Sequence, residues 1–154
     1  MSRAFVKESE GDEGPGLPEL RISEHRNLVT SRGHELIRRR VAALETELGR
    51  ARAAEDRAAT ARIQRDQRYW SERLRTAELV PPQVDAEEAR FGSTLTLEGA
   101  DGRRVRYQIV GEDEAEPREG RLSYVSPVAQ ALLGAQVGDE IDIGGRAMEV
   151  VGIG

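Results

Sequence analysis

The stretch from Thr30 to Val80 constrains the fold most, because large apolar residues recur in it at helical spacing on either side of a polar gap. The gap, residues 50–60, is rich in Ala, Arg, Glu and Asp and holds no large apolar side chain. Steps of three and four residues place one apolar stripe on each flanking segment. The stripes comprise Ile37, Val41, Leu44 and Leu48, then Ile63, Trp70, Leu74 and Ala77. This pattern predicts an antiparallel α-helical hairpin whose turn falls within the gap.

Local signals set the ends of the two helices. Thr30 is a suitable N-cap because its hydroxyl can accept a hydrogen bond from a free amide of the first turn. The first helix is expected from Ser31 to Ala53 or Ala54. The second is expected from Arg57 or Ala58 to Leu79, before Pro81-Pro82, which disfavour helix.

After residues 81–90, which are expected to form a linker, the pattern changes from helical to alternating. Expected strands cover 93–98, 104–110, 122–125, 140–143 and 147–151, with a turn over 99–102. Ser126 as cap and Pro127 at the first helical position begin a short helix that Gly134 stops. The predicted fold class is α+β: a helical hairpin at 30–80 and a small antiparallel-sheet domain with one short helix at 91–154.

Composition agrees with two small units. The chain has 154 residues, of which 38% are hydrophobic and 4% aromatic, which is little for one large core. It contains no cysteine, and its two histidines are far apart, so neither a disulfide nor a zinc cluster is expected. No window approaches the roughly 18 apolar residues of a membrane span. We therefore expect a cytoplasmic protein without membrane contact.

The net charge of −5 conceals an uneven distribution. Residues 30–80 carry 12 basic and 8 acidic side chains, whereas residues 81–154 carry 7 and 14. The hairpin is thus basic and the C-terminal part acidic. Because the acidic part would repel a nucleic-acid backbone, free DNA binding is not expected.

The N-terminal residues 1–29 are polar and rich in Gly and Pro, and they lack periodicity. They are expected to be mostly disordered. Ala4-Phe5-Val6 is the exception that could pack on a neighbour.

Several motifs of the C-terminal part resemble the C-terminal domain of the bacterial GreA/GreB transcript cleavage factors. They occur in the family's order and with its gaps over about 60 residues, and Leu28 to Leu36 resembles the family's entry into its first helix. The C-terminal motifs are Ile109-Val110-Gly111-Glu112-Asp113-Glu114-Ala115, Gly120-Arg121-Leu122-Ser123, Ser126-Pro127-Val128-Ala129-Gln130-Ala131-Leu132-Leu133-Gly134 and Val137-Gly138-Asp139-Glu140.

The resemblance implies a monomeric factor of RNA polymerase. Its FKBP-like C-terminal domain would dock on the rim of the secondary channel, and its coiled coil would enter the channel. In the family, two acids at the tip help the polymerase to hold its second catalytic magnesium, so that backtracked RNA is hydrolysed. The factor itself is then no enzyme, has no cofactor of its own and meets nascent RNA only indirectly.

The tip departs from the family pattern. When Asp56 is aligned with the first acid of the family's tip motif, Ala59 occupies the position of the second acid and Thr60 that of the asparagine. Glu55 is a substitute candidate, which makes Asp56 and Glu55 the candidate magnesium ligands in the complex with polymerase. Acids at the start of a helix are equally explained by its dipole.

The hairpin is also shorter than the family pattern, by roughly eight to ten residues a side, or about 12 to 15 Å of helix. A short hairpin would still fill part of the channel. The alternative is therefore a factor that blocks the channel without stimulating RNA cleavage. Ser126 and Pro127 match the family's polymerase contact, although a plain helix cap explains them as well. The preceding position is acidic in some members of the family and is Val125 here.

Two other classes of function compete with this interpretation. A prolyl isomerase needs an aromatic-lined pocket, for which residues 91–154 offer only Phe91, Tyr107 and Tyr124. A generic helical-hairpin adaptor would make the motif match a coincidence. Failure to bind polymerase would favour the adaptor.

Overall fold

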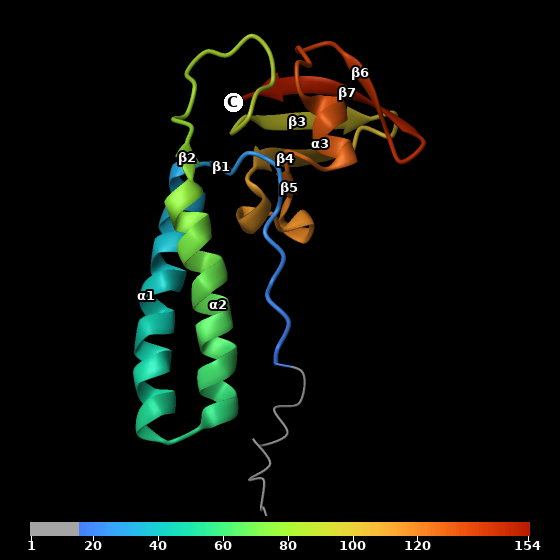
Figure 1. The fold of residues 1–154 in the computed structure, drawn as a ribbon. Coiled ribbons are helices and arrows are strands. Elements are labelled where there is room, and N and C mark those ends of the chain that lie inside the picture. Colours follow the sequence, from blue (N-terminus) through green and yellow to red (C-terminus); the bar gives the residue numbers. More distant parts are fainter. Residues whose placement is uncertain (1–15) are drawn as a thin grey trace, which may run out of the picture.

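The computed structural model describes residues 16–154 and shows two long helices standing side by side, with a small sheet domain at one end (Figure 1). In chain order the elements are β1 (Leu28–Val29), α1 (Ser31–Ala53), α2 (Arg57–Thr76), β2 (Glu78–Leu79), β3 (Thr94–Gly99), β4 (Arg104–Val110), η1 (Glu112–Glu114), η2 (Pro117–Glu119), β5 (Arg121–Ser123), α3 (Pro127–Leu132), β6 (Glu140–Ile143) and β7 (Arg146–Ile153). The predicted α+β class is confirmed. Within residues 16–154, no helix has the combined length and apolar character that a membrane crossing requires.

The hairpin packs along the two predicted stripes. Leu44, Leu48 and Ile63 are buried between the helices, and Trp70 packs against them. The Thr30 hydroxyl accepts a hydrogen bond from the Gly33 amide at 3.0 Å, as the predicted N-cap requires. The first helix therefore begins and ends where the sequence indicated.

The second helix ends at Thr76, three residues before the predicted end at Leu79. The reason is a tertiary contact, because β2 pairs in parallel with β1, and the Glu78 amide donates to the Asn27 carbonyl at 2.8 Å. The Asn27 side chain also donates to the Arg73 carbonyl at 2.7 Å and so satisfies a free acceptor at the end of α2. A pairing between segments fifty residues apart cannot be seen in helical periodicity.

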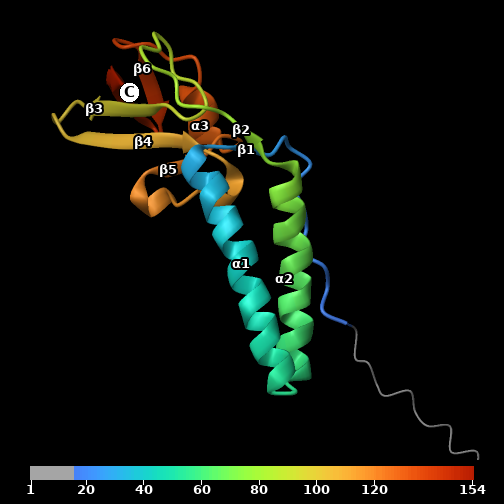
Figure 2. The ribbon, with the colours of Figure 1, turned by 90° about the vertical axis from the view of Figure 1, so that its left-hand side faces the viewer.

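The N-terminal segment runs along α2 before it enters β1 (Figures 1 and 2). Residues 16–27 contain no helix or strand. The strand β1 that follows, Leu28–Val29, lies inside the range 1–29 that was expected to be mostly disordered, and the sequence did not predict it. Residues 1–15, with Ala4-Phe5-Val6, lie outside the described residues.

The C-terminal domain is a five-stranded sheet in the order β5-β4-β3-β7-β6. Three pairings are antiparallel, as predicted, but β5 runs parallel to β4, so the sheet is mixed. The chain crosses from the end of β4 to the start of β5 through η1 and η2, two short helices that the sequence patterns did not reveal.

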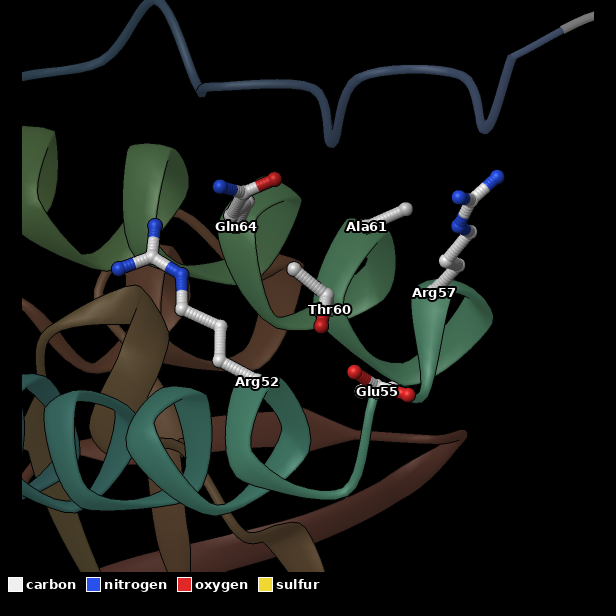
Figure 3. Close-up of a pocket in the computed structure, with 6 residues that line it drawn as sticks. All are labelled: Arg52, Glu55, Arg57, Thr60, Ala61 and Gln64. Carbon is white, nitrogen blue, oxygen red and sulfur yellow. The ribbon is translucent and has the colours of Figure 1, made fainter.

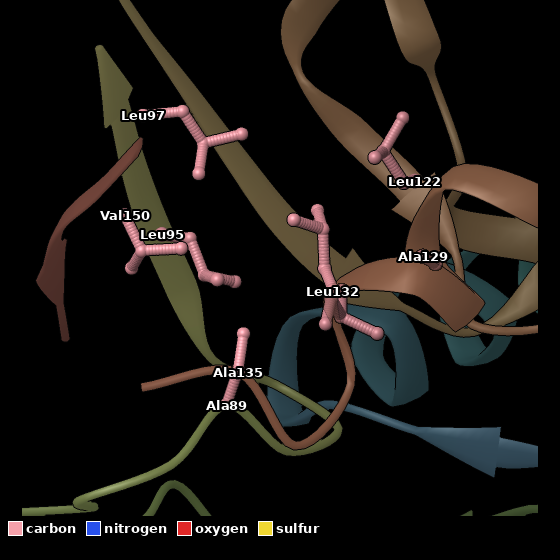
Figure 4. Close-up of a cluster of buried hydrophobic side chains, with 9 residues drawn as sticks. Ala89, Leu95, Leu97, Leu122, Ala129, Leu132, Ala135 and Val150 are labelled. Atoms are coloured by element: carbon pink, nitrogen blue, oxygen red, sulfur yellow. The ribbon is translucent and has the colours of Figure 1, made fainter. Parts of the chain in front are cut away.

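The core of this domain lies between the sheet and α3 (Figure 4). Leu95, Leu97 and Val150 from the sheet and Leu132 from α3 are fully buried. Ala89, from the stretch expected to be a linker, lies in the same core, and Glu88 forms an isolated bridge with Gln136. The domain contacts therefore begin before residue 91.

Candidate functional site at the hairpin tip

The turn at the tip is short and tightly bonded. The amides of Glu55 and Asp56 donate to the carbonyls of Arg52 and Ala51, each at 3.0 Å. Glu55 has a φ of 53°, in the left-handed region that a side chain other than glycine adopts at a cost. The turn thus holds Glu55 exposed at the far end of the molecule.

Asp56 is the N-cap of α2. Its Oδ1 accepts a hydrogen bond from the Ala59 amide at 3.0 Å, and the Thr60 hydroxyl donates to the Asp56 carbonyl at 2.7 Å. Ala59, at the position of the second acid in the resemblance, packs against the hairpin core. Asp56 therefore has one carboxylate oxygen committed to the helix, and the other is without a hydrogen bond from residues 16–154.

An open hollow of about 540 Å³ lies beside this turn (Figure 3). Its lining comprises Arg52, Glu55, Arg57, Thr60, Ala61 and Gln64. In Figure 3, Arg52 reaches from the end of α1 across toward Gln64 of α2, and Arg57 extends from the start of α2. Five of the six lining residues are polar or charged, and the hollow faces solvent.

Arginines outnumber carboxylates at the tip. Residues 50–64 contain Arg50, Arg52, Arg57 and Arg62 against Glu55 and Asp56. None of these four arginines forms an ion pair with any of residues 16–154. Sequence reasoning that followed the tip carboxylates missed these arginines, although their spacing around the gap was visible in the sequence.

The donors at the tip decide whether it fits a magnesium ion. Hard cations take six or more oxygen ligands. No group of three or more His, Cys, Asp or Glu side chains comes together within residues 16–154, and the tip offers the Glu55 carboxylate and one oxygen of Asp56 beside two arginines. This donor set fits a divalent cation poorly, because the guanidinium charges oppose it.

Ser126 and Pro127 lie in the C-terminal domain, away from the tip (Figure 1). The Ser126 hydroxyl accepts from the Ala129 amide at 3.3 Å, and Pro127 occupies the first turn of α3 and is exposed. Both therefore have the capping role predicted for them. The structure brings Glu55 and Asp56 together and leaves Ser126 and Pro127 as a separate surface.

The base of the hairpin is joined to the C-terminal domain by three consecutive carboxylates of η1. Glu112 accepts from the Ser23 hydroxyl at 2.8 Å, and Glu114 accepts from the Thr30 hydroxyl at 2.6 Å. Asp113, between them, binds α2. Each carboxylate thus holds a different segment: the N-terminal segment, α2 and the start of α1.

Asp113 forms the buried part of this junction. It accepts from Arg73 Nε at 2.5 Å and from the Tyr69 hydroxyl at 2.6 Å, and the Arg73 side chain is only 2% exposed. Burial, followed by the hydrogen bond to Asp113, raises the pKa of Tyr69. The Glu112-Asp113-Glu114 run was part of the quoted motif, but its role in joining two units could not be read from it.

Comparison with known proteins identifies the C-terminal domain. Residues 84–153 match the family model described as "Transcription elongation factor, GreA/GreB, C-term". Residues 84–153 are therefore similar to the C-terminal domain of the GreA/GreB family, which agrees with the resemblance stated for the C-terminal part of the sequence.

Individual relatives agree. "Transcription elongation factor GreA" of Methylobacterium nodulans is 43% identical over 76 residues, covering 46% of this chain and 48% of that protein. The same factor of Methylococcus capsulatus is 50% identical over 68 residues, covering 41% and 43%. The chain thus spans about half the length of the curated relatives it matches.

Among solved structures, GreA factor homolog 1 (Gfh1) of Thermus thermophilus is similar with 26% identity and a TM-score of 0.41, covering 82% of this chain and 97% of that one.

Proposed function

We propose that this chain regulates transcription elongation by binding bacterial RNA polymerase at the secondary channel. The observation that carries the proposal is the match of residues 84–153 to the GreA/GreB C-terminal domain. That domain would dock at the channel rim through the loop leading to Ser126 and Pro127, and the hairpin would enter the channel. The partner is the polymerase. Nascent RNA is met indirectly, and neither free DNA nor a membrane takes part.

The junction at the base supports this arrangement mechanically. A hairpin can be aimed into a channel only if its direction is held relative to the docking domain. Arg73, Tyr69 and Thr30 of the hairpin unit bond to adjacent carboxylates of η1, and two of those residues, Arg73 and Thr30, are buried. The same contacts that fix the fold would therefore aim the tip.

The chemistry of the tip favours a factor that blocks the channel over one that stimulates cleavage. Stimulation would need the carboxylates of Asp56 and Glu55 to hold magnesium jointly with the polymerase. Here Asp56 caps a helix, Ala59 provides no acid, and Arg52 and Arg57 flank the turn. In either case the polymerase remains the enzyme, and this chain acts as a monomeric cytoplasmic regulator.

The test adds the purified full chain to a backtracked elongation complex and follows RNA length, with and without an authentic cleavage factor. Protection of the RNA from that factor supports the blocking role. Shortening by the chain alone supports stimulation and would contradict the blocking role. No effect in either reaction, together with no binding to polymerase, would overturn the whole proposal in favour of a hairpin adaptor.

Two variants separate the roles of Asp56. Asp56→Asn keeps the cap, because asparagine caps as well as aspartate, but removes the carboxylate charge. Glu45→Gln on the exposed side of α1 is the matched control. A blocking factor keeps its protection in both variants, whereas loss of an effect on RNA length in Asp56→Asn alone would point to a metal role.

A further inference from the structure

The core-facing side of the C-terminal sheet continues past the part that is fully buried. Neighbouring residues of a strand point to opposite faces, so Val105 and Tyr107 share a face of β4 with the buried Ile109. Met148 shares a face of β7 with the buried Val150 in the same way. Figure 2 shows α3 toward the helical hairpin and the β3–β4 turn at the opposite end of the sheet. At that end the core-facing side chains are only partly buried.

An open hollow of about 750 Å³, here called the sheet hollow, occupies this end of the domain. Its volume falls in the range of roughly 300–1,000 Å³ that is typical of ligand pockets. The Tyr107 hydroxyl adds a polar group to its apolar lining. The other tyrosine hydroxyls, those of Tyr69 and Tyr124, donate hydrogen bonds within residues 16–154, whereas that of Tyr107 does not. The lining comprises Gly99, Ala100, Asp101, Arg103, Val105, Tyr107, Ile143, Arg146, Ala147 and Met148.

Two arginines stand at the rim of the sheet hollow. The alternation along each strand puts Arg103 on the face of Val105 and Arg146 on the face of Met148, and both arginines are exposed. Arg146 forms no ion pair with any of residues 16–154. The Arg103 side chain is 89% exposed, and its Nε lies 3.5 Å from an oxygen of Asp101. Guanidinium groups with free donors are suited to bind a carboxylate.

The strand β6 borders the sheet hollow and has a free edge. It is the last strand in the order of the sheet, so its outer edge pairs with no other strand of residues 16–154. Ile143 of β6 lines the hollow, and Glu140 and Asp142 alternate with Ile141 and Ile143 and so point to the opposite face. A peptide that pairs with a free edge is held by main-chain hydrogen bonds and places every second side chain over one face. Beside β6, that face is the hollow.

We propose that the sheet hollow binds an extended peptide segment of a partner protein, paired with the edge of β6. An apolar side chain of the segment enters the hollow, and a carboxylate two residues away, on the same face, binds Arg103 and Arg146. The rim favours an acidic segment although residues 81–154 carry 7 basic and 14 acidic side chains. The hollow lies where β4 begins, whereas Ser126 follows the end of β5, which runs parallel to β4. The peptide site is therefore separate from the proposed polymerase contact.

Peptide selection tests the chemistry of the segment. A library of random octapeptides displayed on phage is selected on the full chain and, in parallel, on the variant Arg103→Gln with Arg146→Gln. The parent is expected to enrich peptides with a large apolar residue two positions from Asp or Glu, and the variant is expected not to enrich them. The proposal is overturned if the parent enriches no such pattern, or if both proteins enrich it equally.

Titration of the most enriched peptide into the ¹⁵N-labelled full chain then locates the site and shows that each variant is folded. We expect the largest amide shifts within 99–107 and 140–148. The double arginine variant is expected to weaken binding about fivefold or more, and Tyr107→Phe about threefold. The matched control, Arg106→Gln with Arg118→Gln, neutralises two exposed arginines without an ion pair in residues 16–154 and should stay within about twofold of the parent. Largest shifts at 123–134 would contradict the proposal.

Two further measurements exclude other occupants of the sheet hollow. Decanoate offers an apolar chain and a carboxylate without a peptide backbone, and tighter binding of decanoate than of the peptide would assign the hollow to a small amphipathic anion. Shifts at the hollow that grow with the concentration of the chain alone would assign it to a second copy. Either result would overturn the proposal. Neither measurement involves RNA polymerase, so this proposal and the proposed function fail separately.

Discussion

The two ends of the hairpin are built from the same chemical groups in opposite surroundings. At the base, Arg73 and Asp113 face each other out of water and bond to further polar groups. At the tip, Arg52, Arg57 and Glu55 are exposed around an open hollow, and the turn is held by backbone bonds and one cap. A charge that is buried and paired fixes geometry, whereas an exposed one remains available to a ligand. The base is thus suited to orient the hairpin and the tip to meet a partner.

The largest effect is expected from Arg73→Ala. It leaves the Asp113 carboxylate buried without its cation, and removing one partner of a buried pair typically costs about 3–5 kcal/mol. Urea denaturation of the variant measures the free energy of unfolding. Arg52→Ala at the tip is the control, with an expected change within about 0.5 kcal/mol. Similar losses in both variants would remove the proposed contrast between the two ends.

A second comparison uses glycines. A Cβ on Gly111 would lie 2.3 Å from the Leu28 carbonyl oxygen, at the contact of the C-terminal domain with β1, whereas a Cβ on Gly49 in α1 meets nothing within 4 Å. Gly111→Ala is therefore expected to destabilise by about 1–3 kcal/mol, as other overpacked sites do. Gly49→Ala is expected to stabilise the helix by about 0.5–1 kcal/mol. Thermal unfolding would show opposite shifts, and a neutral Gly111→Ala would mean that the junction yields easily.

At the tip, the stability contribution of Asp56 is that of a helix cap. Asp56→Ala is expected to cost about 1 kcal/mol, because the Ala59 amide loses its acceptor. Asp56→Asn, which keeps the acceptor, is expected to stay close to the parent protein. Circular dichroism followed during urea denaturation distinguishes the two. An equal loss in both variants would show that charge, not capping, is what stabilises the turn.

The smallest effect at neutral pH concerns Tyr69. Its pKa is raised in the folded protein by burial and by Asp113, so its contribution to stability is complete below the unfolded value of about 10 and is lost as the pH rises through the folded value. The free energy of unfolding should therefore fall more steeply above pH 10 in the parent than in Tyr69→Phe. If the free energy of unfolding depends on pH in the same way in both proteins, Tyr69 does not contribute to the junction through its bond to Asp113.

Much of the hairpin could be predicted from the sequence because its signals are local. Thr30 as cap and the stripe around Leu44 place the first helix correctly. The second helix was predicted three residues too long, because its end at Thr76 is set by the pairing of Glu78–Leu79 with Leu28–Val29. The parallel pairing of β5 was missed for the same reason, since it depends on how the chain crosses over η1 and η2.

The candidate site was predicted in part. Glu55 and Asp56 lie at the tip as expected, but the sequence does not show that one oxygen of Asp56 is used by the Ala59 amide. Nor does it show which arginines have partners. Arg57 and Arg65 look alike in sequence, and only the structure places Asp66 against Arg65 and leaves Arg57 beside the hollow.

The sequence by itself determined the helical hairpin, the alternating strands and the motifs of a GreA/GreB C-terminal domain, because periodicity, caps and turns act over a few residues. Only the tertiary structure decided how the two units are joined, that Asp113 meets Arg73 and Tyr69 across forty or more residues of chain, and which charges at the tip stay exposed. The physical reason is that burial and charge pairing depend on what lies nearby in space, and distance along the chain carries little information about that.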